Sequence, residues 1–467
     1  MNSKYKYLGK NTIIFAISSF GTKFLSFFLV PLYTAVLSTT EYGTADLITT
    51  TGTLLVFILT INISSSVLRF VIEKRDYGRN ILSYGFRVLI IGTLACSIVL
   101  RVVYEIQILR WPIYYYIFIV LYFFSTALYE MMTNYLRAID EVKEVAIAGV
   151  LSSLIIIIGN IFFLLVLKIG IIGYLTTLVT GPLFSAIYCM ISAKEPIRTY
   201  ICVECDKSLK REMLSYCIPL IFNNIALWIN VFLDHYFVTY YCGVAENGIY
   251  AVSGKISTIL STCFSIFSNA WTLSAIKEFD SKDKDGFFSN TYNIYGALMT
   301  MLCSAIILIN IPLSRFLYSK EFFTAWKYSS ILLLSVMFNT LTVFQGSIFS
   351  AAKQTKIVAI TSVISAVINT ICNMVLIPLI GALGAAIATV FAYFVMWLCR
   401  YIFSRKIIEM RINLKKDFCV YILLMLQIIF EHTTAHFYFG QTLCFTIIVV
   451  LNWKYVKPIV KTIMRKF

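Results

Sequence analysis

Ionisable side chains inside long apolar runs are the residues of this sequence best suited to do chemistry. Lys23 falls near the middle of the apolar run 11–36, and helical spacing places Ser19 and Ser26 on the same face. A charged amine at the centre of a membrane costs about 2.5–3.5 kcal/mol on insertion scales, so Lys23 must face protein or water. We therefore expect Lys23, Ser19 and Ser26 to line a polar cavity that binds an anionic group.

Three basic residues and two carboxylates can be sorted by their depth along the apolar runs. Arg69 ends the second run, where it either contacts a substrate or extends to the lipid headgroups. Arg87 and Glu130 lie at similar depths in neighbouring runs, which makes them candidates for a structural ion pair. Asp234 and Lys255 share a second depth, so they either pair with each other or line the cavity.

The run that carries Asp234 also has a polar stripe. Asn223, Asn230 and Asp234 follow one another at steps of seven and four residues, so they share a helix face that either lines the cavity or hydrogen-bonds to other helices. Asp46 and Asp234 are candidates for binding a coupling ion, and the sequence does not distinguish H⁺ from Na⁺. Pro31 lacks a backbone donor and is expected to kink the first run.

The composition is that of a polytopic membrane protein. Of 467 residues, 59% are hydrophobic and 13% are charged, whereas soluble domains average about 25% charged residues. The first apolar run is too long for a cleaved signal peptide, so we expect it to remain. Apolar runs long enough to cross a bilayer as helices fall at about fourteen places: 11–36, 45–70, 82–104, 113–136, 144–168, 171–193, 213–239, 247–274, 289–312, 326–351, 356–379, 381–403, 417–432 and 439–454.

The basic residues report topology. Lys and Arg gather at the N-terminus, in alternate connections and after the last run, and few occupy the other connections. This bias predicts that both termini are cytoplasmic. The net charge of +16 is therefore attributed to membrane orientation, and no nucleic-acid partner is expected.

A repeat relates the first twelve runs. The segment Val142–Asn160 matches 355–373, and the pair Gly170 and Gly173 matches Gly381 and Gly384 in the next corner. Six runs per repeat give both halves the same orientation, so we expect two six-helix lobes in parallel pseudo-symmetry around a cleft, plus two C-terminal helices. The expected domains are an N-lobe with its linker from 194, a C-lobe and a C-terminal pair, at 1–205, 206–403 and 404–467.

Two local patterns do not carry the chemistry that they suggest. The segment 253–257 lacks the glycine spacing and the hydroxyl residue of a phosphate-binding loop. Cys202 and Cys205 have metal-ligand spacing without a second pair or a nearby histidine, so no metal site is expected. We expect no cofactor.

The opening stretch NTIIFAISSFGTKFLSFFLVPLYTAVLSTTEYGTADL, the repeat and the number of runs resemble the Wzx-type polysaccharide flippases. These belong to the superfamily that also holds the MATE exporters and the lipid II flippases. The resemblance covers essentially the whole chain and is sharpest over 11–50. It implies a MATE-like fold in the bacterial plasma membrane and the movement of undecaprenyl-pyrophosphate-linked oligosaccharide units between leaflets by alternating access.

The resemblance leaves two other functions to weigh. A MATE-type multidrug or cation antiporter shares the architecture, but a lysine in the first run suits an anionic substrate better. A membrane polysaccharide polymerase or acyltransferase would be expected to have a large outer loop, and the outer connections here are short. We therefore expect a flippase that acts in O-antigen or capsule synthesis and is not an enzyme. Its expected partners are lipid-linked substrate, membrane lipids, a polymerase and other assembly proteins.

Overall fold

The computed structural model describes residues 27–464 apart from 108–110, 197–198, 201–202 and 434–436. Its described elements are all helices, and eleven of them are long and apolar enough to cross a membrane. The prediction of an all-α polytopic membrane protein is confirmed. By proximity of Cα atoms the chain divides into two compact units, one reaching to Phe232 and the other beginning at Leu233.

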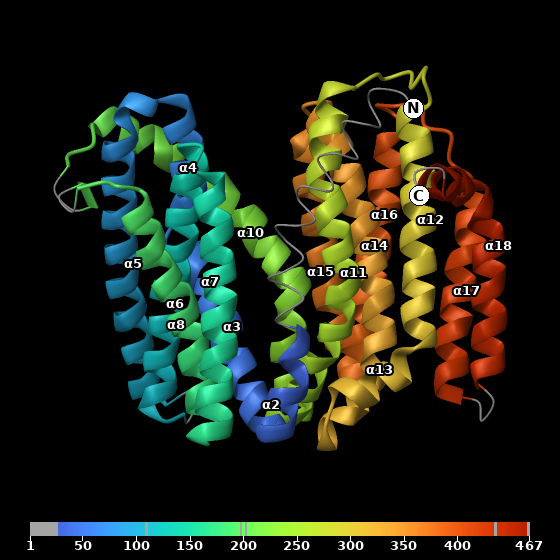
Figure 1. The fold of residues 1–467 in the computed structure, drawn as a ribbon, viewed down its shortest axis with the longest axis horizontal. Helices are drawn as coiled ribbons and strands as arrows, with labels where there is room; N and C mark the ends of the chain where they lie inside the picture. Colours follow the sequence, from blue (N-terminus) through green and yellow to red (C-terminus); the bar gives the residue numbers. More distant parts are fainter. Residues whose placement is uncertain (1–26, 108–110, 197–198, 201–202, 434–436, 465–467) are drawn as a thin grey trace. The chain divides into compact units, whose positions relative to one another are not determined.

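The first unit is built from helices that Figure 1 draws in blue to green. In chain order they are α2 (Val30–Val36), α3 (Thr39–Leu59), α4 (Ile63–Glu73), η1 (Arg75–Tyr77), α5 (Gly78–Ile106), α6 (Ile113–Ala138), α7 (Val142–Asn160), η2 (Ile161–Val166), α8 (Gly170–Ser192) and the first part of α10 (Lys207–Cys242).

The second unit begins inside α10 and continues to the C-terminus. Its further helices are α11 (Val244–Lys277), α12 (Phe287–Leu308), α13 (Asn310–Leu317), η3 (Lys320–Ala325), α14 (Trp326–Ala351), α15 (Thr355–Ile380), α16 (Ala382–Ser404), α17 (Leu414–Thr433) and α18 (Phe437–Met464).

The difference between eleven spanning helices and the fourteen expected runs has specific causes. The run 11–36 lies mostly outside the described residues. The helices α11 and α17 occupy the runs 247–274 and 417–432, but neither meets the criterion of length, hydropathy and charge for a span. The other eleven runs each correspond to one candidate span.

The second apolar run is interrupted. The predicted run 45–70 forms two helices, α3 and α4, which are separated at Ile61 and Asn62 by positive φ angles of 54° and 53°. At the start of α3, Ser38 and Glu41 form a capping box in which the Glu41 carboxylate accepts a hydrogen bond of 2.8 Å from the Ser38 backbone N–H. Because of the interruption at Ile61 and Asn62, Arg69 lies on α4 and not on α3.

Phe27 and Phe28 are helical, Leu29 is a turn, and Pro31 follows in α2, so the helical path is interrupted next to Pro31 and the expected kink stays a prediction. Pro31 lies in the first turn of α2, where a backbone N–H has no intrahelical partner to lose. Lys23, Ser19 and Ser26 lie outside the described residues, so their cavity role stays a prediction.

The repeated glycines at the two corners share a positive φ angle. Gly170 is the first residue of α8 and Gly381 directly precedes α16, with φ angles of +56° and +64°, which disfavour residues with a Cβ atom. The second glycine of each pair allows a close approach, because a Cβ on Gly384 would lie 2.5 Å from the Leu376 carbonyl oxygen and one on Gly173 would lie 2.7 Å from Phe163.

Helix pairing follows the repeat as well. In the first unit α7 packs along α8, and α6 packs against α8. In the second unit α15 packs along α16, and α14 packs against α16. Each matching segment therefore occupies the same position relative to its neighbours, which supports the internal repeat.

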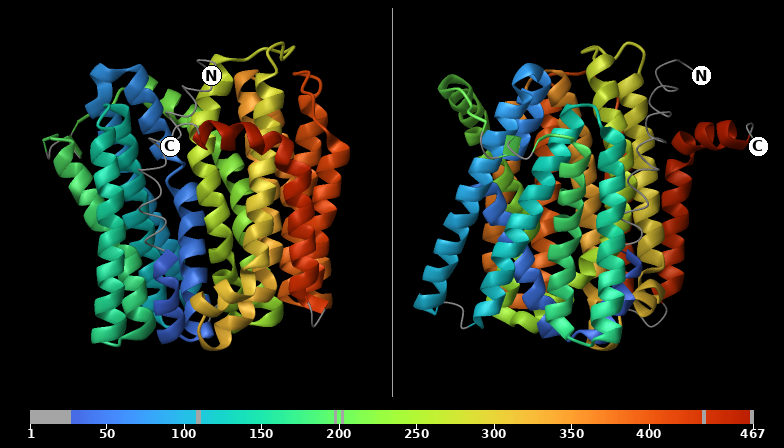
Figure 2. Two further views of the ribbon diagram at one scale, coloured as in Figure 1. Left: turned by 45° about the vertical axis from the view of Figure 1, so that its right-hand side comes forward. Right: turned by 60° about the vertical axis from the view of Figure 1, so that its left-hand side comes forward.

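The last two helices pack on each other and on α12, as the left view of Figure 2 shows. Polar side chains fasten α17 to the second unit, since Ser304 donates to the Gln427 side-chain oxygen at 2.7 Å and Asn310 donates to Glu431 at 2.8 Å. Figure 2 also shows that α18 bends toward its C-terminal end, and Pro458 lies inside this helix.

The division between the units falls inside a helix. The N-terminal part of α10 hydrogen-bonds to the first unit, because Trp228 donates to the Thr50 carbonyl at 3.1 Å and Cys217 to that of Asn62 at 3.6 Å. These contacts explain why the division lies at Phe232, beyond the 194–205 linker. The expected domain limits at 205 and 403 therefore stay predictions.

Candidate functional site

The most buried acidic group among the predicted residues is Asp234, which is 2% exposed on α10. Three neutral donors from three helices surround its carboxylate. Asn373 of α15 donates to Oδ1 at 2.5 Å, and Tyr250 of α11 donates to Oδ2 at 3.2 Å. Thr389 of α16 also donates to Oδ2. Asp234 is therefore held at the junction of four helices of the second unit.

The surroundings of Asp234 have unused hydrogen-bonding capacity. Asn373 also donates to the Asn369 side-chain oxygen at 3.0 Å, and both amides are fully buried. Among the described residues, no partner is present for Asn373 Oδ1 or Asn369 Nδ2. Because the site joins one buried carboxylate to amide and hydroxyl donors and leaves the Asn373 side-chain oxygen without a partner among the described residues, its chemistry suits a proton or a monovalent cation. No cluster of three or more His, Cys, Asp or Glu with the arrangement of a metal site occurs in the described part.

The hydrogen-bond donors to Asp234 in the described part of the structure are neutral, and the alternative pairing with Lys255 stays a prediction. Tyr250 is the donor from α11. Lys255 follows Tyr250 by five residues, which is about 140° around a helix, so it projects from another side of α11. Lys255 is half-buried, and its cavity role stays a prediction.

Arg69 lies in a pocket of about 730 Å³ between α4 and the start of α10. Its Nε donates to Glu73 at 2.8 Å, and its guanidinium lies 4.6 Å from the centroid of the Tyr216 ring. The side chain is 50% exposed, so the guanidinium keeps access to solvent. The complete lining is Arg69, Phe70, Glu73, Ser208, Arg211, Glu212, Ser215 and Tyr216. Two arginines and two glutamates line this pocket, so an anionic ligand would bind through the guanidinium groups in place of their carboxylate partners.

Arg87 and Glu130 each hydrogen-bond to another group in the part of the chain that the structure describes, and the ion pair between them stays a prediction. Arg87 donates to the carbonyl of Val203, in the connection before α10, at 2.9 Å. Glu130 accepts a hydrogen bond of 2.8 Å from Ser64 on α4. The sequence placed both residues at the right depth, but the two side chains project toward different neighbours of the α5–α6 pair.

The remaining predicted residues have separate surroundings. Asn230 is buried, and its amide donates to the Ala226 carbonyl of its own helix at 2.9 Å. Asn223 lies on α10, but its side chain is outside the described part of the structure. Asp46 is half-buried on α3, one turn after Tyr42, whose ring stacks on Tyr33 at 5.3 Å.

Sequence reasoning missed several polar residues that complete these sites. Asn373 was noticed as the repeat counterpart of Asn160, but its contact with Asp234 was not foreseen. Arg400 was missed because it ends the run 381–403 and resembles a topology signal. It is 4% exposed, and its guanidinium donates to Thr342 O at 2.7 Å and to Thr361 Oγ1 at 3.0 Å.

Solved structures with this fold are transporters and flippases. The lipid II flippase MurJ in an inward closed conformation has a TM-score of 0.73 at 15% identity, covering 96% of this chain and 100% of that one. An inward-facing MATE multidrug transporter has a TM-score of 0.63 at 12% identity, covering 84% and 94%. A MOP superfamily transporter from Pyrococcus furiosus has a TM-score of 0.60 at 11% identity, covering 86% and 96%. The chain therefore shares its fold with these multi-pass membrane proteins.

Sequence comparison then gives the family. Residues 8–272, more than half of the chain, match the family described as "Polysaccharide biosynthesis protein", and the chain belongs to this family. An uncharacterized membrane protein of Methanocaldococcus jannaschii is 26% identical over 220 residues, which cover 45% of this chain and 42% of that protein. The chain thus spans less than half the length of this relative. The family and the structural neighbours are flippases and transporters, not enzymes.

Proposed function

We propose that this protein is a flippase that moves undecaprenyl-pyrophosphate-linked oligosaccharide units between the leaflets of the bacterial plasma membrane by alternating access. The observation that carries the proposal is the match of residues 8–272 to the polysaccharide biosynthesis family. The MOP-type fold supports it, because one of the proteins with this fold is a flippase of lipid II. The proposed role is in O-antigen or capsule synthesis.

The physical task of such a flippase is to move charge and sugar through hydrocarbon. The lipid tail can stay in the membrane while the diphosphate and the glycan cross, and both need polar partners on the way. The Arg69 pocket suits the first capture of the diphosphate, since Arg69 and Arg211 both line it and guanidinium groups bind phosphate bidentately. The adjoining Lys74, paired with Glu212 at 2.6 Å, belongs to the basic side that the charge bias makes cytoplasmic.

The predicted cavity residues supply further polar contacts to the substrate. Lys23, Ser19, Ser26, Asn223, Asn230 and Lys255 are proposed to contact the diphosphate or the sugars.

Asp234 is the proposed site for a coupling proton or Na⁺. Its carboxylate is buried among neutral donors, so binding of a cation would remove an uncompensated buried charge. This gives the ion a direct way to favour one conformation of the second unit. Asp46 is the second candidate for the same role.

The experiment that tests the function measures the sidedness of the lipid-linked oligosaccharide. Spheroplasts that lack the gene are probed with a membrane-impermeant lectin, with and without a plasmid copy. We expect completed units to be unreachable without the protein and reachable with it. Units that are already outside but unpolymerised would show that the protein acts after translocation.

A matched pair of arginine variants tests the pocket in the same assay. Arg69→Gln is expected to reduce translocation about 10- to 150-fold, which corresponds to the roughly 1.5–3 kcal/mol of a hydrogen bond to a charged group. Arg75→Gln removes the same charge from a side chain that is paired with Asp140 at 3.4 Å outside the pocket. Equal effects of the two variants would exclude Arg69 as a substrate contact.

The MATE exporters in the same fold class supply the competing outcome. If deletion changes drug sensitivity and leaves the sidedness of the oligosaccharide unchanged, the protein is an exporter.

A further inference from the structure

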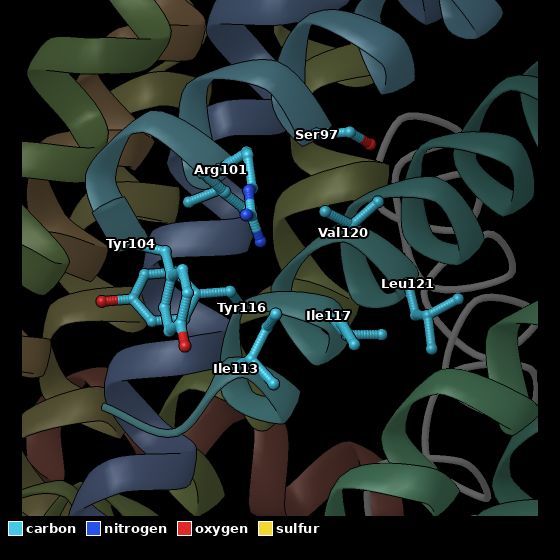
Figure 3. Close-up of a pocket in the computed structure, with 9 residues that line it drawn as sticks. Ser97, Arg101, Tyr104, Ile113, Tyr116, Ile117, Val120 and Leu121 are labelled. Carbon is cyan, nitrogen blue, oxygen red and sulfur yellow. The ribbon is translucent and has the colours of Figure 1, made fainter. Parts of the chain in front are cut away.

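A second pocket lies on the first unit, at the opposite end of α5 from the basic connection. It has a volume of about 240 Å³ and is formed by the last turns of α5 and the first turns of α6. Figure 3 shows the Arg101 side chain in this pocket, with apolar side chains of α6 opposite it. The lining is Ser97, Leu100, Arg101, Tyr104, Ile113, Tyr116, Ile117, Val120 and Leu121.

The pocket opens toward the membrane. Ile113, Ile117 and Leu121 line it and are themselves exposed large apolar residues, and Ile98 and Val102 of α5 are exposed beside it. Aromatic rings close its outer end, since Tyr104 and Tyr116 make an edge contact at 5.6 Å and Trp111 lies 6.3 Å from Tyr116. Trp and Tyr gather at the interface between the hydrocarbon and the headgroups, so the pocket lies at headgroup depth.

An arginine and a glutamate lie at this depth, one helical turn apart on α5. Arg101 is ion-paired with Glu105 one turn further along α5, and their side chains are 61% and 59% exposed. The Arg101 guanidinium also lies 5.5 Å from the centroid of the Tyr104 ring. Because α5 ends at Ile106, Arg101 is on the hydrocarbon side of the pair and Glu105 is on the water side.

We propose that this pocket binds an ethanolamine phospholipid of the leaflet at that end of α5, which the charge bias makes the outer leaflet. The lipid phosphate contacts Arg101, the ammonium contacts Glu105, and one acyl chain lies along Ile113, Ile117 and Leu121. In this lipid the phosphate lies closer to the hydrocarbon and the ammonium closer to water, which is the order of Arg101 and Glu105.

The headgroup has to provide the selectivity. Lipid tails already lie in an apolar medium, so apolar walls favour no lipid over another. A wholly anionic headgroup would meet Glu105 as well as Arg101. A choline headgroup carries its positive charge without N–H donors, so it cannot hydrogen-bond to Glu105. Exposed ion pairs of the i,i+4 type are weak, so the Arg101–Glu105 pair opens readily to a lipid.

Native mass spectrometry tests the proposal on the full-length protein in detergent with equimolar ethanolamine, glycerol and choline phospholipids. We expect one ethanolamine phospholipid to be retained about fivefold over either competitor, the factor that corresponds to one charge contact at a headgroup, here that of the ammonium with Glu105. Glu105→Gln is expected to abolish the preference, because Glu105 is the group that distinguishes the three headgroups, and Asp140→Asn, at an exposed carboxylate outside the pocket, is the matched control that should keep it.

A variant that exchanges the two charged residues tests whether their order along α5, and not only their presence, determines the preference. Arg101→Glu combined with Glu105→Arg keeps the ion pair and the net charge but reverses its direction, and we expect it to lose the preference. Retention of all three lipids alike by the unsubstituted protein, a preference for the glycerol lipid, or a preference unchanged by the reversal would each overturn the proposal. The measurement does not depend on transport, so it stands apart from the proposed flippase activity.

Discussion

Asp234→Asn is the substitution that best separates a coupling site from a structural carboxylate. Asparagine has nearly the same shape, but only one of its two terminal atoms accepts hydrogen bonds. Of the donors from Asn373, Tyr250 and Thr389, those facing the new NH₂ group lose their acceptor. The variant also removes a charge that is almost completely buried.

The stability change follows from two opposing effects. Each donor left unpaired costs about 1–3 kcal/mol, and one or two are left here. Removing a buried charge without a cationic partner recovers several kcal/mol of desolvation. We therefore expect the free energy of unfolding to change by less than about 2 kcal/mol in either direction. Ion dependence of transport should fall by about 5- to 150-fold, the usual size of a coupling between two sites.

The assay combines thermal unfolding in detergent with oligosaccharide translocation at varied pH and Na⁺ concentration. Glu431→Gln is the matched control, because it neutralises another carboxylate of the second unit that is 5% exposed and hydrogen-bonded to Asn310 at 2.8 Å. We expect this control to keep its ion dependence. Normal ion dependence in Asp234→Asn, or the same loss in both variants, would refute the assignment.

Three further predictions concern single features of the second unit. Arg400→Met should leave the thermal unfolding temperature in detergent unchanged or higher, because it removes a buried charge. Its partners Thr361 and Ser362 stay hydrogen-bonded, since they also donate to carbonyls of α15 at 2.8 and 2.9 Å. A clear decrease in the unfolding temperature would contradict this. Gly384→Ala should lower the free energy of unfolding by about 1–3 kcal/mol, because its Cβ would lie 2.5 Å from the Leu376 carbonyl oxygen. Gly254→Ala is the control and should not, because the space at its Cβ is open. Equal unfolding temperatures of the two variants would contradict the close approach at Gly384. Asp280 accepts backbone hydrogen bonds from Lys284 and Lys282, and these lower the pKa of its carboxyl below the usual value near 3.9. The ionised carboxylate therefore stabilises the folded state above that pH, and this contribution is lost as the pH falls through the lowered pKa. The difference in unfolding temperature between the protein and Asp280→Asn should therefore vanish in acid and persist at pH 7.

The apolar runs and the repeat could be predicted because they depend on local sequence. Hydrophobic length determines which segments can span a bilayer, and eleven of the expected runs are candidate spans in the described residues. The matched glycines at 170 and 381 both have positive φ, since the corner they form is set by backbone sterics. Neither inference requires knowledge of the neighbours of a helix.

The break in the second run could not be predicted in the same way. Apolar character continues through Ile61, yet the chain adopts positive φ there and at Asn62 and starts a new helix. Hydropathy measures how a segment partitions into lipid and does not report the direction of the backbone.

The pairing of charges was decided by the tertiary structure. The sequence gives the depth of a residue, because each residue advances a helix by about 1.5 Å. It does not give the direction in which the side chain meets its neighbours. Arg87 and Glu130 share a depth and contact different groups, whereas Asp234 reaches Asn373 and Thr389 from distant parts of the chain. Charges and depths are thus properties of the sequence alone, and only helix packing determines which of them meet.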